Sequence, residues 1–137
     1  MIGILGRERR GIAAILVGMG GFIGSLSRHG IDTVVSHELL GTFLVNVFGC
    51  LLLGVILFTA NRQGRVTRRT RLLLGTGFTA SFTTYSTFIL DVLQVDPILG
   101  ATYAIGSYVG GLSAIAVSRF LVDWHYPGPK QGVRGDR

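Results

Sequence analysis

The run LLGTFLVNVFGCLLLGVILFTA, residues 39–60, contains no Asp, Glu, Lys or Arg. Three further apolar runs, residues 11–27, 72–90 and 97–118, are equally free of these charged residues. A helix of about 20 apolar residues can cross a hydrocarbon core about 30 Å thick. Four such helices in a chain of 137 residues would leave no amphipathic shell to face water. The sequence therefore predicts an all-α integral membrane protein with four transmembrane helices.

We expect a single membrane domain over residues 1–137, with spans at approximately 11–33, 39–60, 71–95 and 97–121 and a flexible tail at 122–137. The first run lacks a small-residue cleavage site flanked by polar sequence, so we expect a retained span rather than a signal peptide. Cys50, in the middle of the second span, has no partner cysteine in the chain and is expected to be a small packing residue.

Basic residues gather in three segments that four spans would place on one side of the membrane. They are Arg7, Arg9 and Arg10; Arg62, Arg65, Arg68, Arg69 and Arg71; and Lys130, Arg134 and Arg137. The two opposite connections contain no Lys or Arg, and the positive-inside rule then predicts a plasma-membrane protein with both termini in the cytoplasm. Despite a sequence pI near 10.5, the basic residues show no interleaved aromatics, so we expect no nucleic-acid partner.

Polar side chains inside a span are expensive, and each one marks a candidate site. Arg28, at the outward end of the first span, could contact an anion, act as an anchor, or pair with Asp32 one turn further on. Asn46 lies in the middle of the second span, with Thr42 one turn before it. Its amide donors suit an anion that must bind and leave, but a hydrogen bond between spans explains this residue equally well.

The segment TASFTTYSTF, residues 79–88, places seven hydroxyl-bearing side chains in the centre of the third span. Such side chains offer the backbone alternative hydrogen bonds, so we expect the helix to break here, and freed carbonyls at a break can coordinate a cation. Tyr85 and Phe88, three residues apart, could turn electropositive ring edges toward a small anion, although such rings are ordinarily packing residues. Tyr103 and Ser107, one turn apart in the fourth span, would add hydroxyl donors.

Two pairs of glycines are spaced four residues apart, Gly20 with Gly24 and Gly106 with Gly110. This spacing places both members of a pair on one helical face and predicts close contact between spans. The alternative is that glycine is simply common in membrane helices.

Three motifs resemble those of the Fluc/CrcB fluoride channels: GGFIGSLSR at 20–28, GTFLVNVFG at 41–49 and FTTYSTF at 82–88. The resemblance covers all four spans in order. It implies two four-helix subunits packed antiparallel, a structural sodium ion at the third-span break, and two fluoride pathways. The fluoride pathway would be formed by Thr42, Asn46, Tyr85, Phe88, Tyr103 and Ser107, and the carbonyls of Ala80 and Thr83 would bind the sodium ion.

The sequence departs from the family pattern at three positions. Ala80 and Ser81 stand where the family usually has two glycines, and Tyr85 stands where it has a phenylalanine. A side chain at Ala80 would be strained by roughly 1 to 2 kcal/mol if the backbone there required a positive φ. Of the features that the resemblance implies, the sodium site is therefore the one that depends most on the backbone conformation at these positions.

The predicted function is passive exit of fluoride through a fluoride-specific channel, which lowers fluoride in the cytoplasm. The alternative is a small four-span proton-coupled multidrug or cation exporter, but such exporters use a carboxylate in the first span, and here none precedes Asp32. A scaffold protein would not explain hydroxyl and amide donors gathered at mid-membrane depth without acceptor carboxylates. No enzyme is expected, because the histidines lie at span ends or in the tail, without neighbours at metal-ligand spacing.

The uneven distribution of Lys and Arg also bears on the partner. A chain with all its basic connections on one side should insert in a single orientation. An antiparallel dimer then requires a homologous second chain inserted the other way, so we predict a heterodimer with a paralogue, surrounded by membrane lipid. A homodimer whose residues have drifted remains the alternative.

Overall fold

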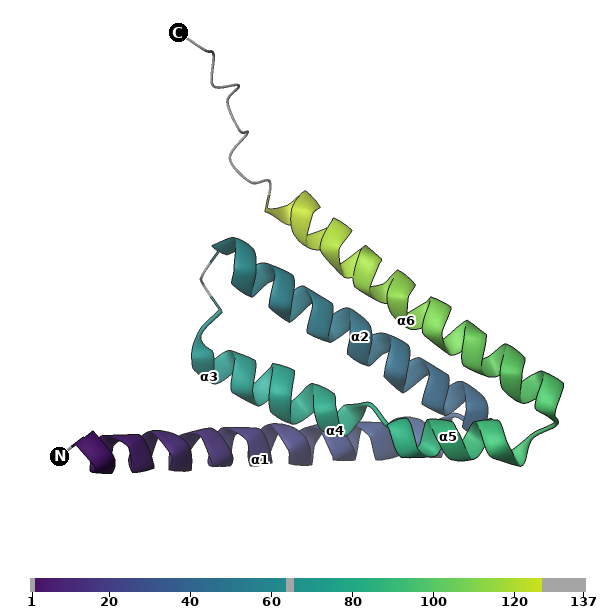
Figure 1. Cartoon of the computed structure of the whole chain (residues 1–137), viewed down its shortest axis with the longest axis horizontal. Coiled ribbons are helices and arrows are strands. Elements are labelled where there is room, and N and C mark those ends of the chain that lie inside the picture. Colours follow the sequence, from purple (N-terminus) through teal and green to yellow (C-terminus); the bar gives the residue numbers. More distant parts are fainter. Residues whose placement is uncertain (1, 64–65, 127–137) are drawn as a thin grey trace, which may run out of the picture.

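The computed structural model describes residues 2–63 and 66–126. Every regular element in this part of the chain is a helix (Figure 1). In chain order they are α1 (Ile2–Val34), α2 (Glu38–Gln63), α3 (Arg68–Thr70), η1 (Arg71–Thr79), α4 (Ala80–Phe82), α5 (Tyr85–Gln94) and α6 (Pro97–His125). Segments of α1, α2 and α6 are long and apolar enough to cross a membrane: Arg10–Val34, Glu38–Asn61 and Pro97–His125. The predicted class, an all-helical integral membrane protein, is confirmed.

The outer helices are longer than the apolar runs predict. Helix α1 already begins at Ile2, before the apolar run that starts at residue 11. Helix α6 continues beyond residue 121 to His125, so residues 122–125 are helical rather than part of the tail. It ends just before the residue that precedes Pro127, a position where the proline ring disfavours helical backbone. Residues 127–137 and Arg65 lie outside the described residues, and the predictions made for them stay open.

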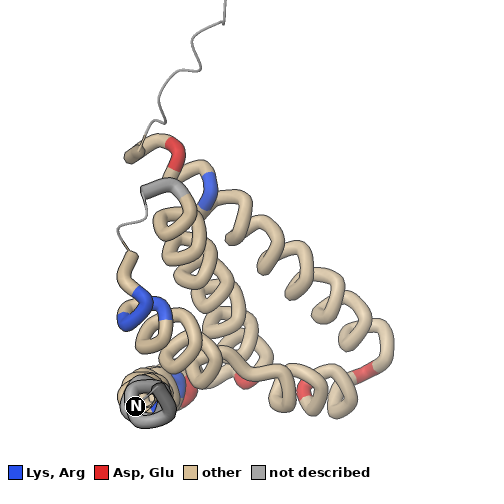
Figure 2. The backbone as a smooth tube through the Cα atoms, turned by 60° about the vertical axis from the view of Figure 1, so that its left-hand side comes forward, with Lys and Arg blue, Asp and Glu red and all other residues tan. Residues whose placement is uncertain are grey.

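The helices pack in two main pairs. Helix α2 runs beside α6, while α1 lies along η1 and α4 (Figure 1). The short helix α5 turns away from the line of η1 and contacts both α2 and α6. Basic positions gather around the start of α3 and η1, and acidic positions lie at the connection of α5 to α6 (Figure 2). The bundle therefore has one basic end.

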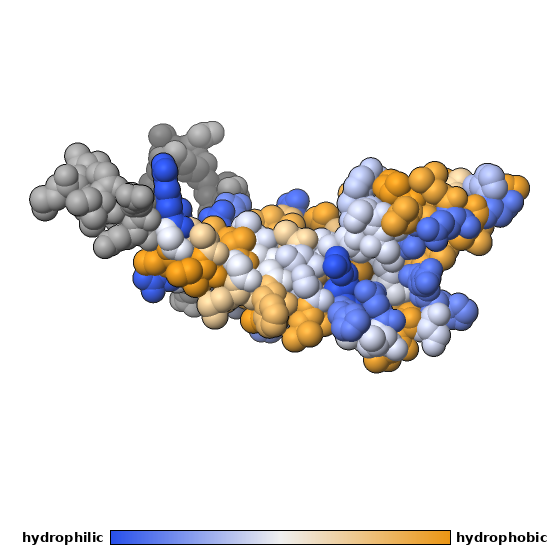
Figure 3. Space-filling view, turned by 90° about the horizontal axis from the view of Figure 1, so that it is seen from below, coloured by the Kyte–Doolittle hydropathy of each residue, from blue (hydrophilic) through white to orange (hydrophobic). Residues whose placement is uncertain are grey.

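Large apolar side chains cover much of the outer surface. Phe22 and Leu26 of α1 and Ile105 and Leu112 of α6 are among those that are exposed. Seen from below, apolar surface extends along much of the molecule and is interrupted by hydrophilic groups (Figure 3). Exposed apolar area of this extent marks a surface that contacts lipid or another chain.

Close contact between α1 and the η1–α4 segment is confirmed at both predicted glycines. A Cβ on Gly20 would collide with the carbonyl oxygen of Leu73, and one on Gly24 with the carbonyl oxygen of Phe78. These contacts are with backbone, which cannot move aside as a flexible side chain can. Glycine at these two positions is therefore required by the packing.

The prediction of close helix contact is correct for only one member of the second glycine pair. Gly110 packs against the ring of Phe43 on α2, as the spacing predicts. Gly106 has no atom of another helix within 4 Å of the position of a Cβ, so the predicted contact there is wrong for the single chain. Four residues along an α-helix correspond to slightly more than one turn, so a shared spacing does not ensure that both glycines meet the same neighbour.

The predicted break in the third pass is present at Thr83 and Thr84. Helix α4 ends at Phe82 and α5 begins at Tyr85, and the two residues between them are extended, with φ and ψ of −77° and 159° for Thr83 and −144° and 124° for Thr84. The hydroxyl of Thr84 accepts a hydrogen bond from the N–H of Thr87 at 3.2 Å and so caps α5. The hydroxyl-rich sequence thus supplies the N-terminal cap that restarts the helix.

On the other side of the break, the backbone forms a π-helix, η1, rather than an α-helix. The hydroxyl of Thr79 donates to the carbonyl oxygen of Leu74, five residues earlier, at 2.8 Å. The hydroxyl of Thr83 donates in turn to the carbonyl oxygen of Thr79 at 2.9 Å. Because π-helices are rare and frequently occur at functional sites, this segment directs attention to the surface that Thr79 and Thr83 share.

Candidate functional site: an intramembrane cavity at the helix break

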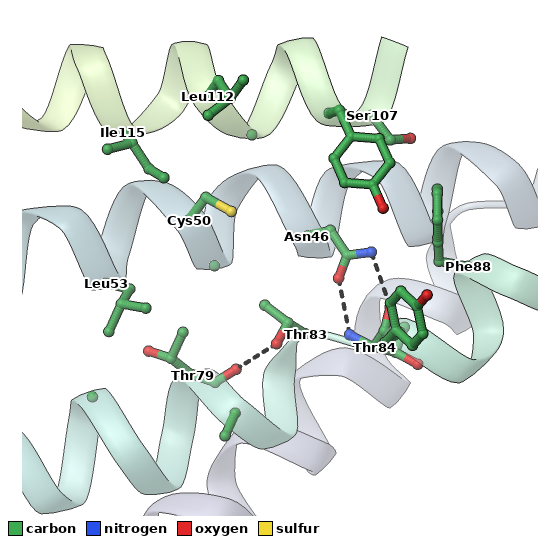
Figure 4. Close-up of a pocket in the computed structure, with 16 residues that line it drawn as sticks. Asn46, Cys50, Leu53, Thr79, Thr83, Thr84, Phe88, Ser107, Leu112 and Ile115 are labelled. Atoms are coloured by element: carbon green, nitrogen blue, oxygen red, sulfur yellow. Dashed lines mark hydrogen bonds between the residues drawn. The ribbon is translucent and has the colours of Figure 1, made fainter. Parts of the chain in front are cut away.

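A cavity of about 470 Å³ opens beside the break, between α2, the η1–α5 segment and α6 (Figure 4). Its polar wall contains the amide of Asn46 and the hydroxyls of Thr79, Thr83, Thr84 and Ser107. Apolar side chains and glycines line the remainder. The structure thus brings residues from three separate passes to one cavity, including most of those that the sequence singled out.

Asn46 of α2 is bonded to the broken backbone on both sides of its amide. Its Nδ2 donates to the carbonyl oxygen of Thr84 at 3.0 Å, and its Oδ1 accepts from the N–H of Thr84 at 2.9 Å (Figure 4). The interhelical hydrogen bond that the sequence left open is therefore formed. An amide nitrogen has two N–H groups, so one donor of Asn46 is not used by this pair of bonds.

Aromatic rings lie around Phe88, which is only 7% exposed. Its ring centroid lies 6.1 Å from that of Tyr85 and 5.7 Å from that of Tyr103, and Tyr108 meets it edge-on at 6.0 Å. Tyr108 also lines the cavity and was missed by the sequence analysis. Tyr85, by contrast, is 72% exposed in the single chain. One of the two predicted rings is therefore already enclosed, and the other still has an open face.

Ser107 of α6 provides the least expected feature of the cavity wall. Its Oγ is buried and, in the part of the chain that the structure describes, has no hydrogen-bond partner. The phenol of Tyr103 lies close enough to interact with this hydroxyl, which also faces the cavity. Native proteins satisfy nearly all buried polar atoms, so this hydroxyl has capacity for a further hydrogen-bond partner in the cavity.

Thr42 and Tyr103 lie beside the cavity rather than on its wall, and Tyr103 contacts a carboxylate that the sequence analysis missed. Asp91 of α5 is 5% exposed, and the phenol of Tyr103 donates to its carboxylate over a long 3.5 Å. Thr42, also buried, lies against the same phenol. The expectation that the donors gather without an acceptor carboxylate is therefore wrong.

The sequence did contain a signal for Asp91. It lies three residues after Phe88, as Phe88 lies three residues after Tyr85, so all three share one side of α5. The signal was missed because the apolar run ends at Leu90, which made Asp91 look like the polar flank of a span. The break tilts α5 toward α6, and this packing buries the carboxylate.

Arg28 does not join this group. It lies on α1, which packs chiefly against η1 and α4, and its side chain is half-exposed. Among the described residues, no carboxylate lies within 4 Å of its guanidinium, so the suggested pair with Asp32 is not formed. Its role as an anchor or as an anion contact stays a prediction.

The backbone at Ala80 and Thr83 is compatible with cation binding. Ala80 has φ of −64° and ψ of −29°, an ordinary right-handed conformation in which a Cβ causes no strain. The N–H of Thr84, which would bond to the carbonyl of Ala80 in a continuous helix, donates to Asn46 instead. A break that diverts its N–H groups in this way frees carbonyl oxygens of the kind that coordinate sodium in broken membrane helices.

Membrane-length helices, a broken pass between them and a partly polar cavity at the break are together typical of a transport protein. Comparison with known proteins gives the family. The model of the family described as "CrcB-like protein, Camphor Resistance (CrcB)" matches residues 15–119. The chain therefore belongs to the CrcB family.

Relatives of known function agree with this assignment. Fluoride-specific ion channel FluC 1 of Natronomonas pharaonis is 43% identical over 113 residues, which are 82% of this chain and 95% of the relative. FluC 1 of Methanospirillum hungatei is 36% identical over 107 residues, with 78% and 76% covered. FluC of Chlorobium phaeobacteroides is 35% identical over 117 residues, with 80% and 91% covered. The predicted resemblance is confirmed, and the relatives are ion channels rather than enzymes.

Proposed function

We propose that the chain forms a fluoride-specific ion channel through which fluoride leaves the cell down its gradient. The relatives named above carry this activity in their names. The single observation in the structure that supports it most is the buried, unpartnered hydroxyl of Ser107 at the cavity wall. A small anion is the acceptor that such a donor lacks, and hydroxyl donors can replace part of the hydration shell of fluoride.

The other cavity residues would complete this binding environment. Asn46 uses one N–H to hold the broken backbone and can turn the other toward the anion. Phe88 is held by three neighbouring rings, so its electropositive edge would be presented without a large loss of side-chain freedom. Thr42 and Tyr103 would extend the donors along α2 and α6, with Asp91 orienting the phenol.

Four passes through the membrane are part of the proposal. Helices α1, α2 and α6 would form three of them, and the segments α3 to α5 together the broken fourth. With four passes, the basic connection between α2 and α3 lies on the same side as both termini. The excess of Lys and Arg there supports a plasma-membrane protein with its N and C termini in the cytoplasm.

The proposed active unit is an antiparallel dimer. The cavity is open on one side, and its apolar rim, together with the exposed ring of Tyr85, is a surface that a second subunit would cover. Uneven charge supports a paralogue as that subunit rather than a second copy, since this chain should insert in one orientation only. Expression of this chain alone tests the point. Termini found on both sides of the membrane, together with full fluoride resistance, would show that a homodimer suffices.

A structural sodium ion fits the backbone at the break. The carbonyl oxygens of Ala80 and Thr83 would hold it, and its charge would fix the two ends of the broken helix while balancing the exposed carbonyl dipoles. The right-handed backbone at Ala80 removes the objection that a residue other than glycine stands there. Sodium would stabilise the assembly and would not be transported.

Efflux from liposomes tests the proposed function directly. Purified protein, together with any partner chain that it needs, is reconstituted, and fluoride and chloride efflux are followed with ion-selective electrodes. We expect fluoride efflux that requires the protein, and chloride efflux no faster than from empty liposomes. Similar rates for the two anions would contradict the proposal. Repeating the measurement after removal of sodium tests the structural ion in the same preparation.

A further inference from the structure

A second cavity lies at the basic end of the bundle, away from the break. It has a volume of about 400 Å³ and is lined by Leu57, Phe58, Ala60 and Asn61 of the last turns of α2 and by Arg71 at the start of η1. It shares no lining residue with the cavity at the helix break. We propose that this pocket binds the phosphate group of an anionic phospholipid.

The polar groups of the pocket suit a phosphate. In the described part of the chain, neither the guanidinium of Arg71 nor the amide of Asn61 has a hydrogen-bond or ion-pair partner within the protein. A guanidinium presents a planar fork of donors that matches phosphate oxygens, and an amide adds a further N–H. The N-terminus of α3 is not the proposed phosphate site. The N–H of Thr70 already donates to the hydroxyl of Thr67, which caps the helix.

The remaining wall of the pocket indicates a lipid rather than a soluble phosphate. Leu57 of α2 is 46% exposed, and Phe58, the next residue, lines the same pocket. The pocket lies where the apolar part of α2 ends, at Asn61, and the end of a membrane span would lie near the phosphate groups of a bilayer. A phosphate on Arg71 would therefore leave its glycerol and first methylene groups against apolar side chains.

Charge complementarity strengthens the assignment. Arg68 and Arg69 are exposed one turn or less before Arg71, and the chain carries a formal net charge of +6. Basic pockets between membrane helices are known to attract anionic headgroups. Arg68 and Arg69 would raise the local concentration of anionic lipid, whereas Arg71 is the one of these three described arginines that lines the pocket.

This difference between neighbouring arginines provides a matched test. The full chain, with any partner it needs, is purified in detergent containing equal amounts of phosphatidylglycerol and phosphatidylcholine, and retained lipid is measured by native mass spectrometry. Arg71→Gln is expected to lower the retained phosphatidylglycerol tenfold or more, as loss of a charge-assisted hydrogen bond implies. Arg69→Gln removes the same charge outside the pocket and should lower it fivefold or less.

Several results would overturn the proposal. Equal losses in the two variants would show a general attraction of anionic lipid to the basic end and no pocket. Displacement of phosphatidylglycerol by millimolar inorganic phosphate would show a site for soluble phosphate. Arg71→Lys and Asn61→Ala are expected to give smaller losses than Arg71→Gln, and they serve if that variant folds poorly. Because the readout is lipid retention, the result does not depend on whether the protein conducts fluoride.

Discussion

The third pass, built from η1, α4 and α5, meets α1 on one side and the cavity on the other, and the two sides are built differently. Toward α1, the contacts are backbone on backbone: a Cβ on Gly77 would collide with the carbonyl of Val17, just as Gly20 and Gly24 leave room for the third pass. Toward the cavity, threonine hydroxyls and the amide of Asn46 bond to a backbone that is no longer a regular helix.

The difference shows how a membrane protein can hold an irregular backbone in place. In lipid, every freed N–H and C=O must find a partner within the protein. The tight contact with α1 holds the segment before the break against that helix. The cavity side can then leave a donor such as Ser107 unpaired without collapsing onto it.

The largest effect is expected from a side chain in the α1 contact. Gly24→Leu would force α1 away from the carbonyl of Phe78, and we expect little or no folded protein, measured as monodisperse protein after detergent extraction. Gly18→Leu lies on the same helix with open space around it and serves as the control. If the two variants behave alike, the contact with Phe78 does not hold α1 in place.

Asn46→Ala is expected to affect both fluoride passage and folding. It removes a proposed anion contact and the two hydrogen bonds that hold the broken backbone at Thr84. We expect loss of fluoride efflux together with a lower thermal midpoint. The N–H and C=O of Thr84 would be left unpaired, at about 1 to 3 kcal/mol each. Loss of efflux at unchanged stability would show that the two bonds contribute little to the fold.

A smaller and more selective effect is expected at Ser107. Ser107→Ala removes one donor to a charged acceptor, and a fall of about tenfold or more in fluoride efflux should follow. Stability should be unchanged or slightly higher, because the hydroxyl makes no hydrogen bond of good geometry among the described residues. Ser113→Ala removes an exposed hydroxyl of the same helix and should leave both quantities unchanged. A loss of stability in Ser107→Ala with normal efflux would assign the hydroxyl to packing.

The smallest effect is expected at Ala80. Since its φ is −64°, Ala80→Gly relieves no strain and should lower stability by about 0.5 to 1 kcal/mol through added freedom of the unfolded chain. Fluoride efflux and its response to sodium should stay the same. A clear gain in stability, measured by thermal unfolding in detergent, would show that the backbone at this position is strained after all.

Much of this architecture could be predicted from the sequence because it depends on local physics. Apolar runs of membrane length become helices wherever the backbone must satisfy its own hydrogen bonds. The hydroxyl-rich segment broke as predicted, since threonine side chains compete for backbone groups. The spacing of Gly20 and Gly24 also predicted a close contact correctly, because side chains four residues apart share a helical face.

Tertiary structure decided what these local features do. Nothing within the second span determines that Asn46 bonds to Thr84, 38 residues away, and the sequence left that role open. Asp91 looked like the polar end of a span until the tilt of α5 placed it against Tyr103. Gly106 and Gly110 have the same local spacing, yet only Gly110 meets a neighbouring helix. Local sequence determines which residues share a face of a helix, whereas only the packing of helices determines what that face meets.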